Sequence, residues 1–295
     1  MMSDSRDFKP EMVRGRFAPS PTGPLHFGSL MAAVGSFLQA RTRQGLWLVR
    51  IEDLDPPREV PGAARDQLAS LRRFGMRPDR PVIYQSSRTA LYHQALERLI
   101  ASGRAYPCAC SRRELPDDGI YPGTCRNGIP PGRRARSIRF RVQSGPEAVD
   151  DRVFGRLVYD LERDSGDFVI RRGDGLIAYQ LAVVVDDADQ RISEVVRGAD
   201  LLDSSARQQQ LYRALGWSVP RWLHLPLAVD RSGRKLSKSD DADPVVRRRP
   251  AEALRLALTA LGHRPPPGAR SLDAQWRWAL GHWNPGQIPR DPFEL

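Results

Sequence analysis

Apolar residues recur with the period of an α-helix in several stretches of the chain. Between residues 28 and 41 they fall at positions i, i+3, i+4, i+7 and i+8, occupied by Leu30, Ala33, Val34, Phe37 and Leu38. The same spacing predicts further helices over residues 62–74, 87–102, 204–215, 250–262 and 272–283. The helix over residues 250–262 is expected to be amphipathic, with Leu254, Ala257, Leu258 and Leu261 on its buried face.

A nearly continuous apolar run, residues 46–51, follows the first helix and predicts a buried strand. A short strand is expected before that helix, over residues 14–18, and another over residues 82–84. A strand, a helix and a buried strand in succession indicate a βαβ unit with parallel pairing. The predicted fold class is therefore α/β.

Strand patterns of a different kind follow in the middle of the chain. Residues 137–142 alternate, with Arg139 and Arg141 on the side expected to face solvent, which predicts a half-exposed strand. Residues 168–179 are typical of a hairpin around a Gly-Asp-Gly turn, and residues 222–229 of one more strand.

A change of character after residue 103 predicts how the chain is divided. Residues 104–136 carry no helical period and are rich in Arg, Pro, Gly and Cys. We therefore expect a first half of the α/β domain, an inserted subdomain, the second half of the domain and a C-terminal helical segment, over residues 1–103, 104–175, 176–243 and 244–295.

Composition and charge narrow the classes of protein that this pattern allows. The charged N-terminus lacks an apolar stretch, and the longest mostly apolar run, residues 176–185, is too short to cross a bilayer. A cytoplasmic protein without a membrane partner is expected. Among 295 residues, 46 Lys and Arg oppose 35 Asp and Glu, and this net charge of +11 favours polyanionic partners. Nine arginines and three acids lie between residues 103 and 141, so this segment is the predicted contact for an acidic polymer.

One segment joins the first strand to the strongly periodic helix and could bind phosphate. From residue 16 to residue 29 it reads Arg-Phe-Ala-Pro-Ser-Pro-Thr-Gly-Pro-Leu-His-Phe-Gly-Ser. A helix N-terminus offers N–H groups and partial positive charge, His26 is placed to donate to a phosphoryl oxygen, and Gly28 allows close approach of a ligand. An ordinary strand–loop–helix connection with a capping serine is the alternative.

A second segment, residues 230–239, places a tight turn before two lysines. Lys235 and Lys238 are two of only three lysines in a chain that otherwise uses arginine. A compact, mobile ammonium can follow a phosphate as it moves, whereas a guanidinium fork is more rigid. A solvated basic loop would carry the same residues.

The three cysteines of the chain, Cys108, Cys110 and Cys125, lie within one Pro- and Gly-rich stretch. Such clustering with a cytosolic profile indicates a metal rather than a disulfide. Three thiolates suit tetrahedral Zn²⁺, which needs a fourth ligand, and no histidine is near in sequence. Three reduced, buried thiols are the alternative.

Taken together, the two phosphate-binding candidates resemble the motifs of class I aminoacyl-tRNA synthetases. Residues 26–29, His-Phe-Gly-Ser, are similar to the HIGH motif, and residues 235–239, Lys-Leu-Ser-Lys-Ser, to the KMSKS loop. Residues 16–23 and 51–55 narrow the resemblance, which covers residues 14–240, to the glutamyl branch. Phe27 and Leu236 depart from the motifs but keep apolar bulk. Ser29 replaces the last histidine, so phosphate handling depends more on His26 and on backbone amides.

The resemblance implies a Rossmann-like catalytic core with an inserted zinc-containing acceptor-type subdomain and a short helical C-terminus. It implies a ligase that uses ATP with Mg²⁺, in which His26 and Lys238 are catalytic. The implied ATP-binding residues are His26, Gly28, Ser29, Lys235, Ser237 and Lys238. Tyr121 takes the place of the fourth ligand of one structural zinc ion, with water or a distant histidine as alternatives.

The resemblance also implies the residues that bind L-glutamate. Two carboxylates and one ammonium require at least two cationic or donor groups and one anion. Arg16 and Arg197 match the carboxylates, Glu52 the ammonium, and Tyr179 supplies a hydroxyl; Phe17, Ala18, Pro19 and Ser20 complete the set. Without the resemblance, Glu52 and Arg197 would be taken for ion-pair residues.

Length points to a particular substrate. Only 56 residues follow residue 239, too few for the large anticodon-binding region of full glutamyl-tRNA synthetases. The chain is similar to truncated paralogues that activate glutamate without tRNA and transfer it to queuosine at the wobble position of tRNA(Asp). A minimal synthetase that charges the 3′ end of tRNA(Glu), and a catalytically silent RNA-binding paralogue, remain open. We expect a monomer.

Overall fold

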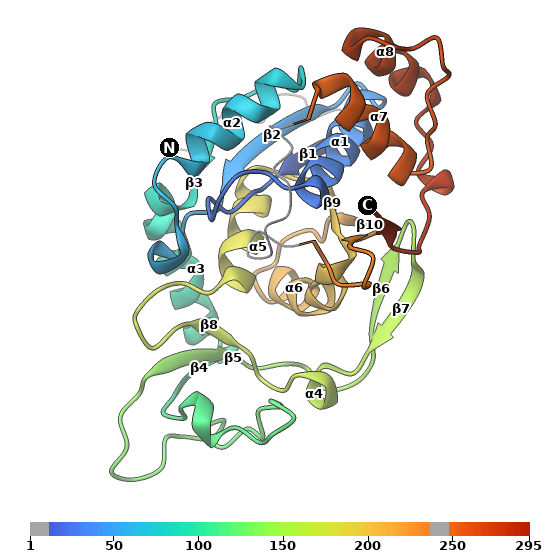
Figure 1. Cartoon of the computed structure of the whole chain (residues 1–295). Helices are drawn as coiled ribbons and strands as arrows, with labels where there is room; N and C mark the ends of the chain where they lie inside the picture. Colours follow the sequence, from blue (N-terminus) through green and yellow to red (C-terminus); the bar gives the residue numbers. More distant parts are fainter. Residues whose placement is uncertain (1–11, 237–247) are drawn as a thin grey trace.

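The computed structural model describes residues 12–236 and 248–295, and a parallel sheet and a mixed sheet that meet edge to edge form its centre (Figure 1). β1 (Arg14–Phe17), β2 (Leu46–Ile51) and β3 (Ile83–Tyr84) pair in that order. β9 (Glu194–Gly198) pairs with β10 (Arg221–Leu225). β9 lies beside β1, where the N–H of Ser193 donates to the carbonyl of Arg14 over 2.9 Å. The strand order therefore reverses between β1 and β9, where such folds bind ligands.

Helices cover both faces of this central layer. α1 (Phe27–Arg41), α7 (Pro250–Ala260) and α8 (Leu272–His282) share one apolar core with Val196 and Leu223. α3 (Thr89–Ala101), α5 (Tyr179–Asp189) and α6 (Leu202–Ala214) share the other with Val195 and Trp222. Neighbouring residues of β9 and β10 thus enter opposite cores, as the strand period of two requires. Leu71 of α2 (Ala63–Arg73) belongs to the same apolar core as α1.

The strongest sequence predictions are confirmed. The helix expected over residues 28–41 is α1, and the five apolar residues that defined its face are all buried. The other five predicted helices are α2, α3, α6, α7 and α8, with ends shifted by a few residues. The first two predicted strands are β1 and β2, and they pair in parallel. The fold class is α/β.

The middle of the chain forms two further structures. β4 (Ala105–Cys108), β5 (Ser137–Phe140) and β8 (Val169–Arg171) make an antiparallel sheet that carries the cysteines. β6 (Glu147–Asp151) and β7 (Gly155–Tyr159) form a hairpin, followed by the short α4 (Leu161–Asp164). β6 also pairs with β10, so the central layer receives a strand from the middle of the chain.

Three strand predictions are wrong in part. Every residue of β5 is buried, because Arg139 lies 3.7 Å over the ring of Tyr121 and donates to the carbonyl of Asp167. The predicted hairpin over 168–179 is present but short: an antiparallel bridge joins Arg171 of β8 to Ile177 across the Gly-Asp-Gly turn, and Tyr179 already begins α5. The strand over 222–229 divides into β10 and β11 (Ala228–Val229) around Pro226; β11 pairs with β12 (Phe293–Glu294) near the C-terminus.

Elements that were not predicted from the sequence include β4, β6, β7, β9 and α5. Residues 181–187 of α5 are all buried, so the helix shows no polar face and its valines are typical of a strand. In the described ranges, 12–236 and 248–295, no helix has the length and apolar character needed to cross a membrane.

Candidate active site

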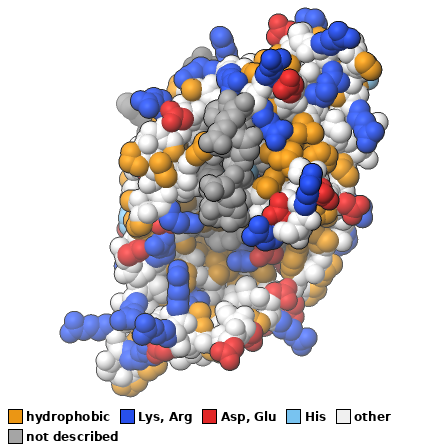
Figure 2. All heavy atoms as spheres, in the orientation of Figure 1, with side chains coloured by type: hydrophobic (Ala, Val, Ile, Leu, Met, Phe, Trp, Pro, Cys, Tyr) orange, Lys and Arg blue, Asp and Glu red, His pale blue; other side chains and the backbone are white. Residues whose placement is uncertain are grey.

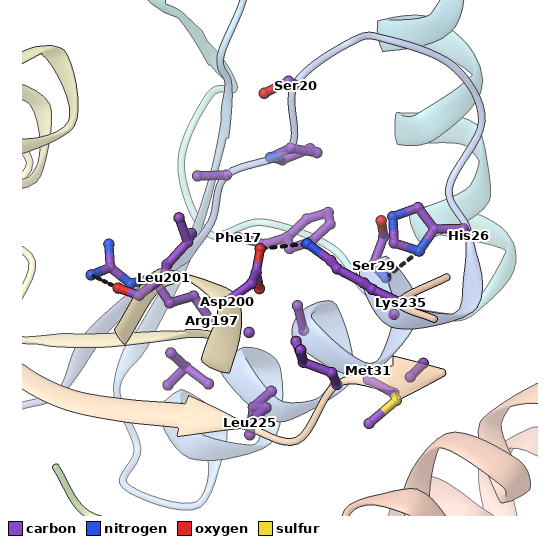
Figure 3. Close-up of a pocket in the computed structure, with 18 of the residues that line it drawn as sticks. Phe17, Ser20, His26, Ser29, Met31, Arg197, Asp200, Leu201, Leu225 and Lys235 are labelled. Carbon is purple, nitrogen blue, oxygen red and sulfur yellow. Dashed lines mark hydrogen bonds and ion pairs between the residues drawn. The ribbon is translucent and has the colours of Figure 1, made fainter. Parts of the chain in front are cut away.

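A cavity of about 510 Å³ opens at the carboxyl ends of β1 and β9 (Figure 3). It contains all the residues that the sequence assigned to glutamate: Arg16, Phe17, Ala18, Pro19, Ser20, Glu52, Tyr179 and Arg197. It also contains four of the residues assigned to ATP, namely His26, Gly28, Ser29 and Lys235. Ser237 and Lys238 lie outside the described residues. The structure thus brings together segments that are up to about 200 residues apart in the sequence.

On the nucleotide side, His26 caps the N-terminus of α1. Its Nδ1 accepts from the N–H of Ser29 over 3.3 Å, so a neutral ring carries its proton on Nε2. A Cβ on Gly28 would lie 3.1 Å from Cε1 of His26, so a side chain here would have to shift the imidazole by a few tenths of an ångström. The arrangement leaves a ring N–H donor beside the positive end of a helix, which suits phosphate oxygens.

Lys235 is held across the cavity mouth. Its Nζ forms an ion pair with Asp200, which follows β9, and its backbone bridges to Val229. The turn before it is fixed by Asp230, whose carboxylate accepts from the N–H groups of Ser232 and Arg234. Figure 3 shows the Lys235 side chain running from the side of Ser29 and His26 toward Asp200, so its ammonium lies on the cavity wall.

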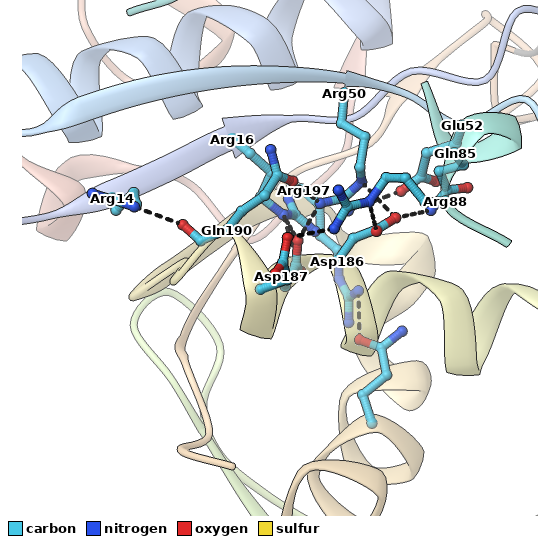
Figure 4. Close-up of polar contacts among 12 residues, drawn as sticks. Arg14, Arg16, Arg50, Glu52, Gln85, Arg88, Asp186, Asp187, Gln190 and Arg197 are labelled. Atoms are coloured by element: carbon cyan, nitrogen blue, oxygen red, sulfur yellow. Dashed lines mark hydrogen bonds and ion pairs between the residues drawn. The ribbon is translucent and has the colours of Figure 1, made fainter. Parts of the chain in front are cut away.

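The β1 side of the cavity is a buried ion-pair cluster (Figure 4). Nε of Arg16 contacts both carboxylate oxygens of Asp187 at 3.2 Å, and Nη1 of Arg50 contacts the same carboxylate at 2.7 Å. Nη2 of Arg50 also contacts Glu52 at 3.1 Å. Burial would raise the pKa of Asp187, but the two arginines hold it below its ordinary value. Burial raises the pKa of Glu52, against the opposing effect of Arg50.

The β9 side presents a cation without a paired anion. Arg197 is 5% exposed, and its guanidinium donates to five neutral acceptors: Nε2 of His224 at 3.0 Å, Gln208 at 2.8 Å, Ser205 at 2.8 Å, the carbonyl of Leu201 at 3.1 Å and the hydroxyl of Tyr179 at 3.4 Å. No carboxylate of residues 12–236 or 248–295 forms an ion pair with it. Burial lowers the pKa of Arg197. A buried guanidinium that lacks a counter-charge favours binding of an anionic ligand.

Several residues that shape the site were missed in the sequence, above all Asp187, Arg50, Asp151 and His224. The partners that join them across the site, Arg16 with Asp187 and Arg197 with His224, lie 171 and 27 positions apart, so spacing carries no signal for these contacts. Three of the four interrupt or end an apolar run: Arg50 stands between Val49 and Ile51, His224 stands between Leu223 and Leu225, and Asp187 follows three valines and Asp186. An ionisable residue inside a buried run needs a partner, and that was the available signal.

A second cavity, of about 660 Å³, adjoins the first and shares Ser20, Glu52, Arg58 and Tyr179 with it. It lies between the central layer and the sheet of β4, β5 and β8, and its far wall includes Arg112 and Arg136. The two cavities together form a path from the cysteine-bearing sheet to the amino-acid side of the site.

The three cysteines can hold a metal ion. Their Sγ atoms lie within 4.8 Å of one another, and those of Cys110 and Cys125 are 3.8 Å apart. The hydroxyl oxygen of Tyr121 lies 3.3 Å from Sγ of Cys108 and accepts from the N–H of Cys125 at 2.8 Å. The hydroxyl of Tyr121 thus lies beside the three thiols.

Several arginines of residues 103–141 are buried or paired with acids, so fewer of them can contact an acidic polymer than the composition suggests. Arg126 pairs with Asp167 and Glu162, Arg133 pairs with Glu114, and Arg139 is buried. The exposed members without an ion pair to any described residue are Arg112, Arg113, Arg134 and Arg136. Figure 2 shows basic side chains gathered on this part of the molecule, at the lower left.

Comparisons with known proteins agree with this geometry. Residues 12–118 and 126–259 match the family model described as tRNA synthetases class I (E and Q), catalytic domain. A protein of Chromobacterium violaceum named glutamyl-Q tRNA(Asp) synthetase is 54% identical over 291 residues, which cover 96% of this chain and 98% of the relative. A protein of the same name from Dechloromonas aromatica is 55% identical over 293 residues, with 96% and 97% covered.

Solved structures place the chain in the same group. A glutamate tRNA ligase from Elizabethkingia meningosepticum, crystallised with its amino acid, superposes with a TM-score of 0.80 at 25% identity, over 96% of this chain and 67% of that one. The described Rossmann-like core, the cavity and the two motif regions are consistent with this match. The chain belongs to the class I tRNA synthetase (E and Q) family, among relatives named glutamyl-Q tRNA(Asp) synthetase.

Proposed function

We propose that the chain activates L-glutamate with ATP and transfers the glutamyl group to queuosine at the wobble position of tRNA(Asp). The observation that carries the proposal is one cavity that joins Arg16, Glu52 and Arg197 to His26 and Lys235. A buried cation without a counter-charge and a neighbouring carboxylate suit the two carboxylates and the ammonium of glutamate. The names of the relatives supply the acceptor. A monomer acting in the cytoplasm, where ATP and tRNA are present, is part of the proposal.

Activation would proceed by displacement at phosphorus. A carboxylate oxygen of glutamate attacks the α-phosphorus of ATP, the new O–P bond forms, and pyrophosphate leaves with the electrons of the broken P–O bond. The Nε2 proton of His26, the first N–H groups of α1 and the ammonium groups of Lys235 and Lys238 stabilise the charge on the phosphate oxygens. Mg²⁺ bound to ATP would neutralise part of that charge. Positioning and electrostatics carry the rate, and no protein nucleophile is needed.

Transfer would follow through the second cavity. A hydroxyl of the queuosine cyclopentenediol attacks the carbonyl of the adenylate, loses its proton and releases AMP. The shared wall at Ser20, Glu52, Arg58 and Tyr179 supports this direction of approach. The exposed Arg112, Arg113, Arg134 and Arg136 would contact the phosphates of the tRNA.

We propose that the bound metal is zinc and that its role is structural. A tetrahedron with Zn–S bonds of about 2.3 Å places its sulfurs about 3.8 Å apart, which fits the separation of Cys110 and Cys125. Cys108 and Tyr121 would complete the set. Purified protein should contain one zinc per chain by elemental analysis; a metal-free preparation that folds and reacts normally would contradict this.

The decisive test separates activation from transfer. Glutamate-dependent exchange of pyrophosphate into ATP, measured without tRNA, should be present and should fall strongly in Lys238→Ala. Transfer of labelled glutamate should occur to queuosine-containing tRNA(Asp), and not to queuosine-lacking tRNA(Asp) or to tRNA(Glu). Charging of tRNA(Glu) would favour a minimal synthetase, and absence of exchange a catalytically silent paralogue.

A further inference from the structure

We infer that His224 positions the guanidinium of Arg197 for a carboxylate of the amino acid, and that Asp151 fixes His224 in the tautomer which this role needs. The inference rests on the proposed function, since it assigns Arg197 to the amino acid. The three residues cross three adjacent strands, because β10 lies between β6 and β9 and His224 is in register with Arg197. All three are at most 5% exposed.

The hydrogen bonds determine which ring nitrogen carries the proton. Oδ2 of Asp151 lies 2.7 Å from Nδ1 of His224 and also accepts from the His224 N–H at 3.0 Å. Oδ1 of the same carboxylate accepts from the N–H groups of Val153 and Phe154, both at 2.9 Å. An ionised carboxylate only accepts, so Nδ1 must donate. Nε2 then keeps its lone pair, which accepts from Nε of Arg197 at 3.0 Å.

The surroundings keep the ring neutral. The charged groups that face it are Asp151 from β6, Arg197 from β9 and Arg16 from β1; Ser205 of α6 lies 3.4 Å from Nε2, and Trp222 stacks at 6.4 Å. Burial lowers the pKa of His224, and the two arginines add to this against the opposing hydrogen bond of Asp151. A protonated ring would present an N–H to the N–H of Arg197, which the observed distance does not allow.

A neutral acceptor serves this position better than a carboxylate would. Arg16 is held by Asp187, which neutralises it. Arg197 is oriented just as firmly, yet its charge remains for the ligand because imidazole accepts a hydrogen bond without supplying an anion. The contact of Arg197 with Tyr179, at 3.4 Å the longest of its five, lies on the cavity wall and is the one that a ligand carboxylate can replace. His224 is therefore a positioning residue that acts through Arg197.

Two substitutions separate this role from a general effect on folding. The shorter amide of His224→Asn can still donate to Asp151 but cannot reach Arg197. The longer amide of His224→Gln can accept from Arg197 but gives up the contact to Asp151. We expect the KM for glutamate to rise roughly 10- to 100-fold in His224→Asn, as for loss of a hydrogen bond to a charged group, and only by about 5-fold or less in His224→Gln. The KM for ATP should change by less than about 2-fold in both.

The control is Asp150→Asn, next to Asp151 in sequence but paired at the surface with Arg156 at 3.3 Å, which should leave both KM values and the free energy of unfolding unchanged. Nitrogen NMR of histidine-labelled protein should show the His224 proton on Nδ1, with the signal identified by its absence in His224→Gln. The inference would be overturned by equal KM increases in the two variants, or by KM increases proportional to each variant's loss of stability. A proton on Nε2 would also overturn it.

Calorimetric binding of glutamate without ATP distinguishes this inference from the proposed function. If the wild-type protein binds glutamate but exchanges no pyrophosphate, the proposed function fails, and the glutamate affinities of the two variants still decide the role of His224. If exchange is normal and His224→Asn keeps the wild-type KM and affinity for glutamate, the inference alone fails. If no glutamate binds, both are wrong.

Discussion

The two sides of the amino-acid cavity each present a buried arginine, and the two are held in opposite ways (Figure 4). On the β1 side, Arg16 and the neighbouring Arg50 share the carboxylate of Asp187. On the β9 side, Arg197 has five neutral acceptors. The first arrangement is balanced before any ligand binds, whereas the second keeps a net positive charge at the cavity wall.

Because of this difference, we expect one side to determine the stability of the fold and the other to determine binding of the ligand. Removal of one member of a buried ion pair leaves an unpaired charge, so the β1 side should matter most for folding. The β9 side already contains an unpaired charge, which costs stability in the free protein and is offset when an anion binds. Substitutions on the two sides should therefore affect different measurements.

The largest effect is expected for Asp187→Asn. Arg16 would remain buried without an ion pair to any described residue, although Arg50 keeps Glu52 and Asp186, and the free energy of unfolding should fall by about 3–5 kcal/mol. Urea denaturation with and without the substitution measures this. A loss below about 1 kcal/mol would mean that the β1 side is not the structural one.

Arg197→Gln should show the reverse behaviour. Loss of a buried charge that contacts a ligand carboxylate typically costs about 2–5 kcal/mol of binding, or roughly 30-fold or more in glutamate affinity. Stability should fall less than in Asp187→Asn, because no ionised partner is left behind. Calorimetric titration with glutamate and urea denaturation of the same preparation test both halves. A protein that loses stability but keeps its affinity would reverse the comparison.

The two sides should lose their contributions to stability at different pH values. The pKa of buried His224 lies below its ordinary 6.5, so below pH 6.5 the unfolded chain binds more protons than the folded one. The stability that neutral His224 provides is thus complete above pH 6.5 and is lost as the pH falls through the folded pKa, by at most about 1.4 kcal/mol per pH unit. Asp187, with a pKa below its ordinary 3.8, acts only at lower pH. The wild type should therefore lose stability relative to His224→Gln between pH 7 and 5; a constant difference would contradict this assignment.

The smallest effect on stability is expected for Lys235→Gln. This residue lies at the exposed end of the site and serves as a reference for the two buried sides. The side chains of Lys235 and Asp200 are 46% and 33% exposed, so their ion pair should contribute less than about 1 kcal/mol. Thermal denaturation should therefore change little, while the KM for ATP in pyrophosphate exchange should rise. A large loss of stability would show that this loop is part of the folded core.

Part of the site could be predicted from the sequence because its residues lie in continuous segments. One segment contains the end of β1 and the loop after it, residues 16–20, and the start of α1 with His26, Gly28 and Ser29. Its motif can be recognised from the sequence alone. The helical period of α1 was clear from the spacing of its apolar side chains, although none of its residues is exposed. α5 was missed because its three consecutive valines lie in a continuous apolar run and resemble a strand.

The sequence by itself determined the α/β class, the family resemblance, and the residue types that surround the cavity. The tertiary structure alone decided that Asp187 neutralises Arg16 and that a neutral His224, fixed by Asp151, holds Arg197. These pairs join positions 171, 27 and 73 residues apart. Periodicity reports on neighbours along one element, but the charge state of a buried group depends on which distant strands pack around it.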